Sequence, residues 1–233
     1  MMQTREKREY IVVSVGGSLI VPDGIDVSFL KQFRELVIRK IGEGFGFYII
    51  TGGGKIARQW RDAAVEVNPE TSDEDLDCIG IAACRLNANV VRGIFANPGL
   101  PPVILDTRQP IDFDSSLLFA GGVRPGNSSD WAAVEAAKAV GTKKLVNLSN
   151  IDYVYTADPR KEPAAKKIER ISWAEFRKLL PETWDPGLSA PFDPVAAKEA
   201  EALRLEVAII NGARLEEFEN YISEKPFMGT VVS

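Results

Sequence analysis

The sequence GGVRPGNSSD, residues 121–130, joins an apolar segment to the alanine-rich stretch 131–140. Two glycines end the apolar segment, and Asp130 opens an expected helix that runs to Val140. A turn rich in Gly and Ser at a helix start offers free backbone N–H groups and the positive end of the helix dipole, which suit an anionic group. Ser and Asp also cap helices for structural reasons alone, so this segment by itself leaves both interpretations open.

Apolar, β-branched runs alternate with helical patterns along the chain. Strands are expected at residues 10–15, 47–51, 103–105, 116–121, 144–148, 206–211 and, as a terminal edge strand, 229–232. Helices are expected from Asp26 or Ser28 to about residue 40, from Ser72 or Asp73 to about residue 95, and at 55–67, 131–140, 173–180, 193–203 and 215–222, with loops at 19–24 and 149–159. Because the apolar runs lack a period of two, they predict strands buried on both faces. The pattern predicts an α/β fold, a three-layer αβα sandwich with a mostly parallel central sheet.

The composition narrows the possible functions. The 233 residues are 45% hydrophobic and 26% charged, which suits one α/β domain or two tightly joined lobes. The net charge is -5 and the pI about 5.1, so general nucleic-acid binding is disfavoured. The chain contains no histidine, which excludes Ser-His-Asp and Cys-His nucleophile systems and most zinc sites.

The cysteines and the charged beginning of the chain indicate a cytoplasmic protein. Cys78 and Cys84 have neither the spacing of a metal pair nor that of a redox motif, and both are expected to be reduced core or near-core residues. Residues 1–10 lack the long apolar run of a signal peptide, and no stretch reaches membrane-spanning length. The four tryptophans are expected to pack rather than to stack on bases: Trp60, Trp131, Trp173 and Trp184.

Small or polar residues follow four of the expected strands, at 16–18, 52–54, 121–130 and 149–158. Ligands of open α/β sheets bind beyond the carboxyl ends of the strands, and glycine lets backbone N–H groups approach a phosphate closely. No G-x-x-x-x-G-K-[S/T] motif occurs and no G-x-G-x-x-G follows the first strand, so a P-loop NTPase and a dinucleotide dehydrogenase are disfavoured. Phosphoryl transfer suits a chain without histidine, because positioning and cationic charge carry most of its catalysis.

At these residues the chain resembles the amino acid kinase superfamily, and within it the archaeal-type uridylate (UMP) kinases. The matching motifs occur in the family's order: SVGGSLI (14–20), ITGGGKIAR (50–58), DCIGIAACRLNA (77–88), GGVRPGNSSDWAAVEAA (121–137), NLSNIDYVYTADPR (147–160), DPVAAK (193–198) and GTVV (229–232). The resemblance implies the amino acid kinase fold and phosphoryl transfer from ATP to UMP, giving ADP and UDP. It also implies Mg²⁺ that is bound through ATP, with no metal ligand from the protein alone.

The resemblance further implies roles for individual residues. UMP would contact Gly53, Asp77, Arg124, Pro125, Gly126, Asn127, Ser128, Ser129 and Asp130. ATP would contact Gly17, Ser18, Gly54, Arg58, Ser149, Asn150, Tyr155 and Asp158, with Gly54 and Arg58 between the two substrates. Asp130 would organise the catalytic lysines, of which Lys198 lies on the ATP side. Each residue also has a structural alternative: Asp130 as a helix cap, Lys198 as a solvated lysine, Asp158 as a turn former.

Three departures from the family pattern bear on activity. Many superfamily members carry a lysine where this chain has Ser14, and Lys55 is the nearest catalytic candidate to replace that charge. A glycine of the family becomes Tyr153, whose ring could narrow the adenine site, while Arg124 and Asn127 stand where histidine is frequent. Two alternatives therefore stay open: a kinase for another small phosphate or carboxylate acceptor, and an inactive nucleotide-binding or storage paralogue on the same fold.

The resemblance implies two lobes that share one continuous sheet. Residues 1–148 would form the N-terminal lobe, which binds the acceptor and makes the oligomer contacts, and residues 149–233 would form the C-terminal lobe, which binds ATP. A homo-oligomer built from dimers, up to a hexamer, is implied, with the early helices at the dimer interface. The expected partners are ATP and UMP, with no nucleic acid and no membrane.

Overall fold

Parallel strands form the centre of the molecule. The computed structural model describes residues 9–97, 99–111, 114–182 and 190–233. The strands are Tyr10–Val15 (β1), Gly46–Thr51 (β2), Leu117–Ala120 (β3), Lys144–Ser149 (β4), Val154–Tyr155 (β5), Lys167–Ile168 (β6), Arg170–Ile171 (β7), Glu206–Asn211 (β8) and Thr230–Val232 (β9). A seven-stranded sheet has the order β3-β2-β1-β4-β8-β9-β7, and β5 pairs separately with β6. All neighbours from β3 to β8 are parallel, whereas β9 runs antiparallel to β8 and parallel to β7.

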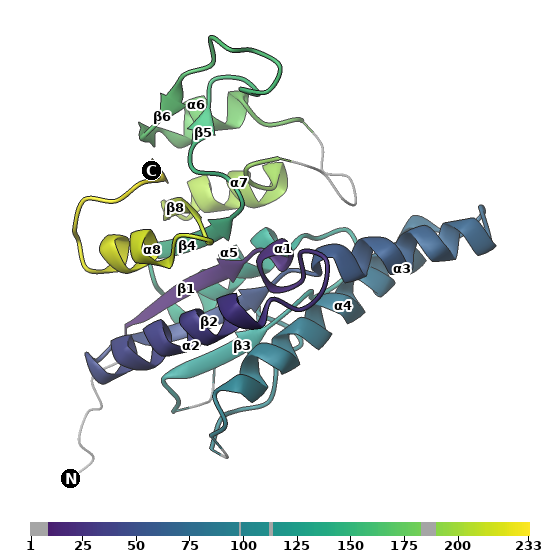
Figure 1. Ribbon diagram of the computed structural model, residues 1–233, viewed down its shortest axis with the longest axis horizontal. Helices are drawn as coiled ribbons and strands as arrows, with labels where there is room; N and C mark the ends of the chain where they lie inside the picture. The colour runs from purple at the N-terminus through teal and green to yellow at the C-terminus, as the bar shows by residue number, and fades with distance from the viewer. Residues whose placement is uncertain (1–8, 98, 112–113, 183–189) are drawn as a thin grey trace.

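Helices cover both faces of this sheet (Figure 1). They are Gly17–Ile20 (α1), Val27–Gly42 (α2), Gly54–Val67 (α3), Asp73–Ile94 (α4), Ser129–Val140 (α5), Trp173–Lys178 (α6), Pro194–Ala202 (α7) and Leu215–Ile222 (α8). One core layer holds Phe33 of α2 and Phe218 of α8 against Val13 of β1. The other holds α5, α6 and α7 against the opposite face, where Val12 and Tyr48 point. Both faces of the strands are therefore buried, which confirms the predicted three-layer αβα sandwich.

Local sequence sets the helix boundaries. Asp26 begins α2, because its carboxylate accepts the N–H of Phe29 over 2.8 Å. Ser72 begins α4 in the same way, through the N–H of Asp75 at 3.1 Å. At each of these starts the sequence offered two candidate caps, and the structure selects the residue whose side-chain oxygen reaches an otherwise free N–H.

Several short elements differ from the sequence-based expectation. Residues 17–20 form α1, whereas a loop was expected from residue 19, and β5 lies within the expected loop 149–159. The expected strand 103–105 is reduced to a single bridge between Ile104 and Ala120, since Pro101 and Pro102 supply no backbone donors before it. The strand near the C-terminus is not an edge strand, because β7 pairs along its outer side.

The burial of cysteine and tryptophan departs from expectation at two positions. Cys78 is exposed on α4, so only Cys84, which is half-buried, fits the expected near-core placement. Trp131 and Trp173 are buried as expected, but Trp60 is 64% exposed on α3. Trp184 and residues 1–8 lie outside the described residues. Within the described part of the chain, no helix has both the length and the apolar character needed to cross a membrane.

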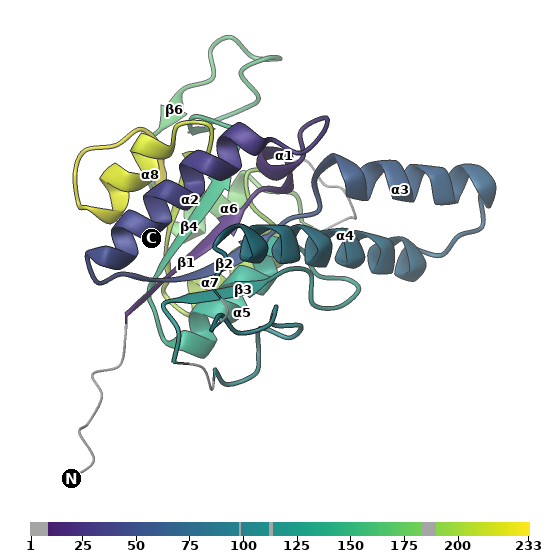
Figure 2. The same cartoon turned by 60° about the horizontal axis from the view of Figure 1, so that its bottom comes forward.

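The helices α3 and α4 run side by side and extend beyond the sheet (Figure 2). In α3, Ala57 is the residue that is buried, and it lies in the first turn. In α4 the buried residues lie from Ala83 onward, in the half that approaches the sheet. The start of α3 and the middle of α4 therefore lie near the carboxyl ends of the strands, while the end of α3 and the start of α4 extend into solvent.

Two glycine turns pack backbone against backbone at the ends of β1 and β2. A Cβ atom placed on Gly17 would lie 2.0 Å from the nitrogen of Gly54 and 2.6 Å from the carbonyl carbon of Gly52. Gly54 also has a φ of +65°, a conformation that residues with a side chain rarely adopt. The absence of side chains at these positions is therefore a condition for the two strand ends to approach each other.

We expect Gly17→Ala to lower the free energy of unfolding by about 2 kcal/mol or more, because overpacking a rigid contact forces the backbone apart. Gly24→Ala is the matched control, since a Cβ atom there meets no atom within 4 Å. Urea denaturation of both variants measures the difference. Equal midpoints for the two variants would contradict the interlocking of the glycine turns.

Candidate active site

A cleft of about 280 Å³ opens beyond the ends of β2 and β3. Residues of α3 and α4 and the starts of α5 and α7 surround it. This is the edge of a parallel sheet at which ligands of open α/β folds bind. The lining residues are Gly53, Gly54, Ala57, Arg58, Arg61, Asp77, Gly80, Ile81, Cys84, Gly122, Asn127, Ser128, Ser129, Asp130, Ala190, Phe192 and Asp193.

Asp130 borders the cleft and accepts hydrogen bonds from three separate segments. The hydroxyl of Ser14 on β1 donates to Oδ1 over 3.3 Å, and the amide of Asn147 on β4 donates to the same oxygen over 3.4 Å. The backbone N–H of Asp193, just before α7, donates to Oδ2 over 3.2 Å. One carboxylate therefore joins two sheet strands and the start of a helix that is distant in sequence.

Burial and a second acid control the charge of this carboxylate. Removal from water, and then the charge of Asp193, raise the pKa of Asp130 to about 7, although the N–H of Asp193 and the hydroxyl of Ser14 oppose the shift. Asp193 is itself buried, and its Oδ1 accepts the N–H groups of Val195 and Ala196. Because two acids lie side by side here, a cation in the cleft would favour the ionised form of Asp130.

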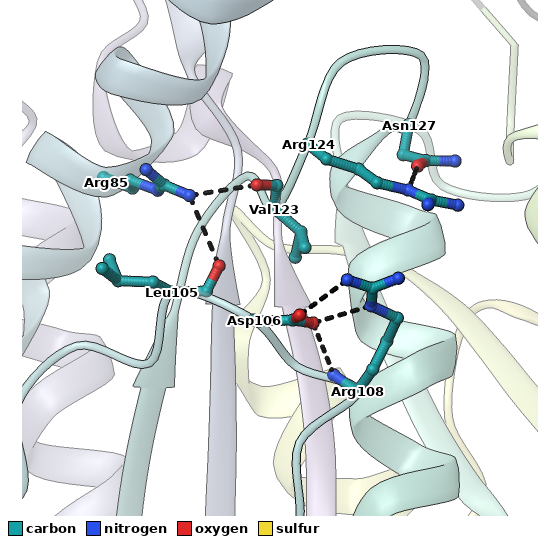
Figure 3. Close-up of polar contacts among 7 residues, drawn as sticks. All are labelled: Arg85, Leu105, Asp106, Arg108, Val123, Arg124 and Asn127. Carbon is teal, nitrogen blue, oxygen red and sulfur yellow. Dashed lines mark hydrogen bonds and ion pairs between the residues drawn. The ribbon is translucent and has the colours of Figure 1, made fainter.

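The 121–130 loop is held by two residues of α4. Arg85 donates to the carbonyl oxygens of Val123 at 3.0 Å and of Leu105 at 3.3 Å, as Figure 3 shows. Asp77 accepts the backbone N–H of Gly126 over 2.6 Å. Arg85 therefore holds the loop at Val123, and the carboxylate of Asp77 holds it at Gly126.

The start of α5 is capped by Ser128 and not by Asp130. The hydroxyl oxygen of Ser128 accepts the N–H of Trp131 over 3.1 Å, which leaves the Asp130 side chain free for the contacts described above. Arg124 donates to the side-chain oxygen of Asn127 over 2.7 Å (Figure 3), and its guanidinium lies 5.2 Å from the centre of a Trp131 ring. The Arg124 side chain thus packs over the helix start, while Asn127 and Ser128 border the cleft.

The turn after β2 is fixed from α4 and faces two arginines of α3. The amide of Asn87 donates to the carbonyls of Gly52 at 2.8 Å and Gly53 at 3.2 Å, and the N–H of Lys55 donates to the carbonyl of Val21 at 3.1 Å. Arg58 and Arg61 border the same cleft. The two guanidinium groups make this end of the cleft suited to a phosphate.

Comparison with known proteins identifies the family of this chain. The model of the Amino acid kinase family matches residues 9–211. The chain belongs to this family. The uridylate kinase of Methanocorpusculum labreanum is 31% identical over 225 residues, which cover 95% of this chain and 94% of the relative. The uridylate kinase of Pyrococcus abyssi is 34% identical over 191 residues, 80% of this chain and 83% of the relative. The crystal structure of uridylate kinase from Archaeoglobus fulgidus has a TM-score of 0.78 and 26% identity, covering 96% of this chain and 99% of that one.

The structure of this family member brings part of the predicted site together. The predicted residues that line the cleft are Gly53, Gly54, Arg58, Asp77, Asn127, Ser128, Ser129 and Asp130. Gly17 adjoins them through its contact with Gly52 and Gly54. Outside the lining lie Ser18, Lys55, Arg124, Pro125, Gly126, Ser149, Asn150, Tyr155, Asp158 and Lys198. The nucleotide-binding role of each of these residues stays a prediction.

The two candidate lysines of this kinase differ in their surroundings. Lys198 lies on the exposed side of α7 and makes no hydrogen bond or ion pair with the described residues. Lys55 is paired with Asp23, across the loop that follows α1. Lys198 is therefore the one whose ammonium group is available without breaking an existing ion pair.

On the predicted ATP side, two residues have structural partners. Asp158 accepts the backbone N–H and the guanidinium of Arg160, each over 3.0 Å, so it does form a turn. Tyr153, which replaces a family glycine, is buried, and the ammonium of Lys167 lies 4.8 Å from the centre of its ring. Whether this ring narrows an adenine site stays a prediction.

Sequence reasoning did not find four residues of this site. Asn147 and Asp193 hold Asp130, and Ser14 was noted only as the loss of a lysine. Arg61 lies three residues after Arg58 on α3. Because residues three apart share a helix face, this spacing could have indicated that Arg61 also borders the cleft. Asn147 and Asp193 begin the motifs 147–160 and 193–198, but nothing in those motifs showed that both residues donate to Asp130.

We expect the free energy of unfolding of the wild-type protein to fall between pH 4.5 and pH 8. The Asp130→Asn variant should show a smaller fall over the same range. Because the folded protein holds the proton on Asp130 to about pH 7 and an unfolded Asp loses it near pH 4, folding binds a proton in this window and stability declines as pH rises. Urea denaturation of both proteins across the range measures this. Parallel curves would contradict a raised pKa at Asp130.

Proposed function

We propose that this protein transfers the γ-phosphoryl group of ATP to UMP, giving ADP and UDP. The observation that carries the proposal is the cleft that joins the Gly53-Gly54 turn to Asn127–Asp130, in a chain that matches uridylate kinases over more than nine-tenths of its length. The same relatives favour this reaction over another acceptor or an inactive paralogue. The matches cover the predicted ATP-binding half as well as the acceptor half.

The chemistry asks little of a general base. The acceptor is already a phosphate anion at neutral pH, so catalysis consists of positioning two phosphates in line and neutralising the charge between them. Gly53, Gly54 and Arg58 line the cleft and would contact the phosphates there. Lys198, on the side of α7, would stabilise charge on the transferring group, and Asp130 would orient it.

The remaining partners follow from the same reaction. Among the described residues no three His, Cys, Asp or Glu side chains lie together, so the phosphates of ATP would supply most ligands of a Mg²⁺ ion. Bound in this way, Mg²⁺ neutralises charge on the phosphates. We further propose a cytoplasmic homo-oligomer in pyrimidine nucleotide synthesis, with residues 1–148 on the acceptor side and 149–233 on the ATP side.

The decisive experiment is a coupled assay of ADP release with ATP, Mg²⁺ and either UMP or uridine. We expect ADP release with UMP and none with uridine, because the acceptor oxygen belongs to the phosphate. A panel of other nucleoside monophosphates and small carboxylates tests the alternative acceptors. Absence of UMP-dependent ADP release over a range of Mg²⁺ concentrations would overturn the proposal.

We expect Lys198→Gln to lower kcat by about a hundredfold, the usual cost of removing a charge-stabilising donor from a transition state. Lys178→Gln on α6 is the matched control, since Lys178 is an exposed helix lysine paired with Glu175. Steady-state kinetics with saturating ATP and UMP measure both variants. If the two variants keep the same kcat, Lys198 has no part in catalysis.

A further inference from the structure

Two arginines of α3 border the cleft and have no polar partner among the residues that the structure describes. Arg58 and Arg61 lie three residues apart, on the same helix face, and Arg61 is half-buried. Neither forms a hydrogen bond or an ion pair with the described residues. Arg85 and Arg92 on the neighbouring α4, in contrast, donate to backbone carbonyls. Arg58 is exposed, so the two guanidinium groups remain open to a ligand in the cleft, and paired arginines suit a phosphate.

The aliphatic part of Arg61 passes over α4 at a glycine. A Cβ atom on Gly80 would lie 4.0 Å from Cδ of Arg61, and the carbonyl oxygen of Gly80 lies 3.5 Å from the position of a Cβ atom on Gly53. Side chains of a helix lean toward its N-terminus, so Arg61 leans toward the turn at Gly53 and Gly54. Both guanidinium groups therefore approach the start of α3.

The acids of the cleft are already engaged elsewhere. Asp77 accepts the N–H of Gly126, and Asp130 accepts its three donors. Neither acid forms an ion pair with Arg58 or Arg61 within the described residues. The two positive charges therefore remain for a ligand, and a nucleoside monophosphate carries a phosphate whose charge approaches -2 at neutral pH.

We propose that Arg61, together with Arg58, holds the phosphate of the acceptor nucleotide, so that two guanidinium groups clamp one dianion. This inference rests on the proposed function, because it names the acceptor's phosphate as the group that occupies this end of the cleft. Arg61 determines acceptor affinity and the preference for a phosphorylated acceptor. ATP binding does not depend on it.

The test compares Arg61→Gln, Arg61→Lys and the wild type by titration calorimetry with UMP and with uridine, and by steady-state kinetics. We expect Arg61→Gln to weaken UMP binding and raise the KM for UMP by about tenfold, the usual loss for a hydrogen bond to a charged group. Uridine affinity and the KM for ATP stay unchanged. Arg61→Lys gives an intermediate loss, because a lysine keeps the charge but not the fork of donors.

Arg39→Gln is the matched control, since Arg39 lies near the C-terminal end of α2, paired with Glu219, and does not line the cleft. Thermal unfolding checks that Arg61→Gln folds like the wild type. An equal loss of UMP and uridine affinity, or no loss at all, overturns the clamp while UMP turnover by the wild type keeps the proposed function. A wild type that neither binds nor phosphorylates UMP overturns both.

Discussion

The structure of the cleft depends on the contact between two stretches of bare backbone. Gly17 lies so close to Gly52 and Gly54 that no side chain fits between them. This contact brings the ends of β1 and β2 together and places Gly53 and Gly54, where α3 begins, at the lining of the cleft. Asn87 then holds the same turn from α4, so the spacing of the two helices follows from the glycine contact.

The carboxylate of Asp130 connects the two halves of the chain through hydrogen bonds. Asp130 takes hydrogen bonds from β1, β4 and the residue that precedes α7, which lie 116, 17 and 63 residues away along the chain. Ser14 contributes a hydrogen bond and no charge to Asp130, and the other two donors are also neutral. The acid is therefore kept in place by neutral donors.

The fold could be predicted from the sequence because its main signals are local. The buried strands are continuous apolar runs, and β1, β8 and α8 have the bounds that these runs and their flanking turns predict. The two-residue strands β5, β6 and β7 could not be predicted, since pairing over long distances gives no periodic pattern within two residues. In the site, the glycine turns and Asn127–Asp130 carry recognisable motifs. Asn147, Asp193 and Arg61 were missed because each looks like an ordinary strand, cap or surface residue until its neighbours are known.

The hydrogen bond from the backbone of Asp193 to Asp130 has a consequence for how the two halves communicate. A proton on the Oδ2 atom of Asp130 would weaken the acceptor for this N–H, and a shift of α7 away from α5 would remove a donor that stabilises the ionised acid. Helix position and protonation are therefore linked reciprocally, as any two equilibria that share one interaction must be.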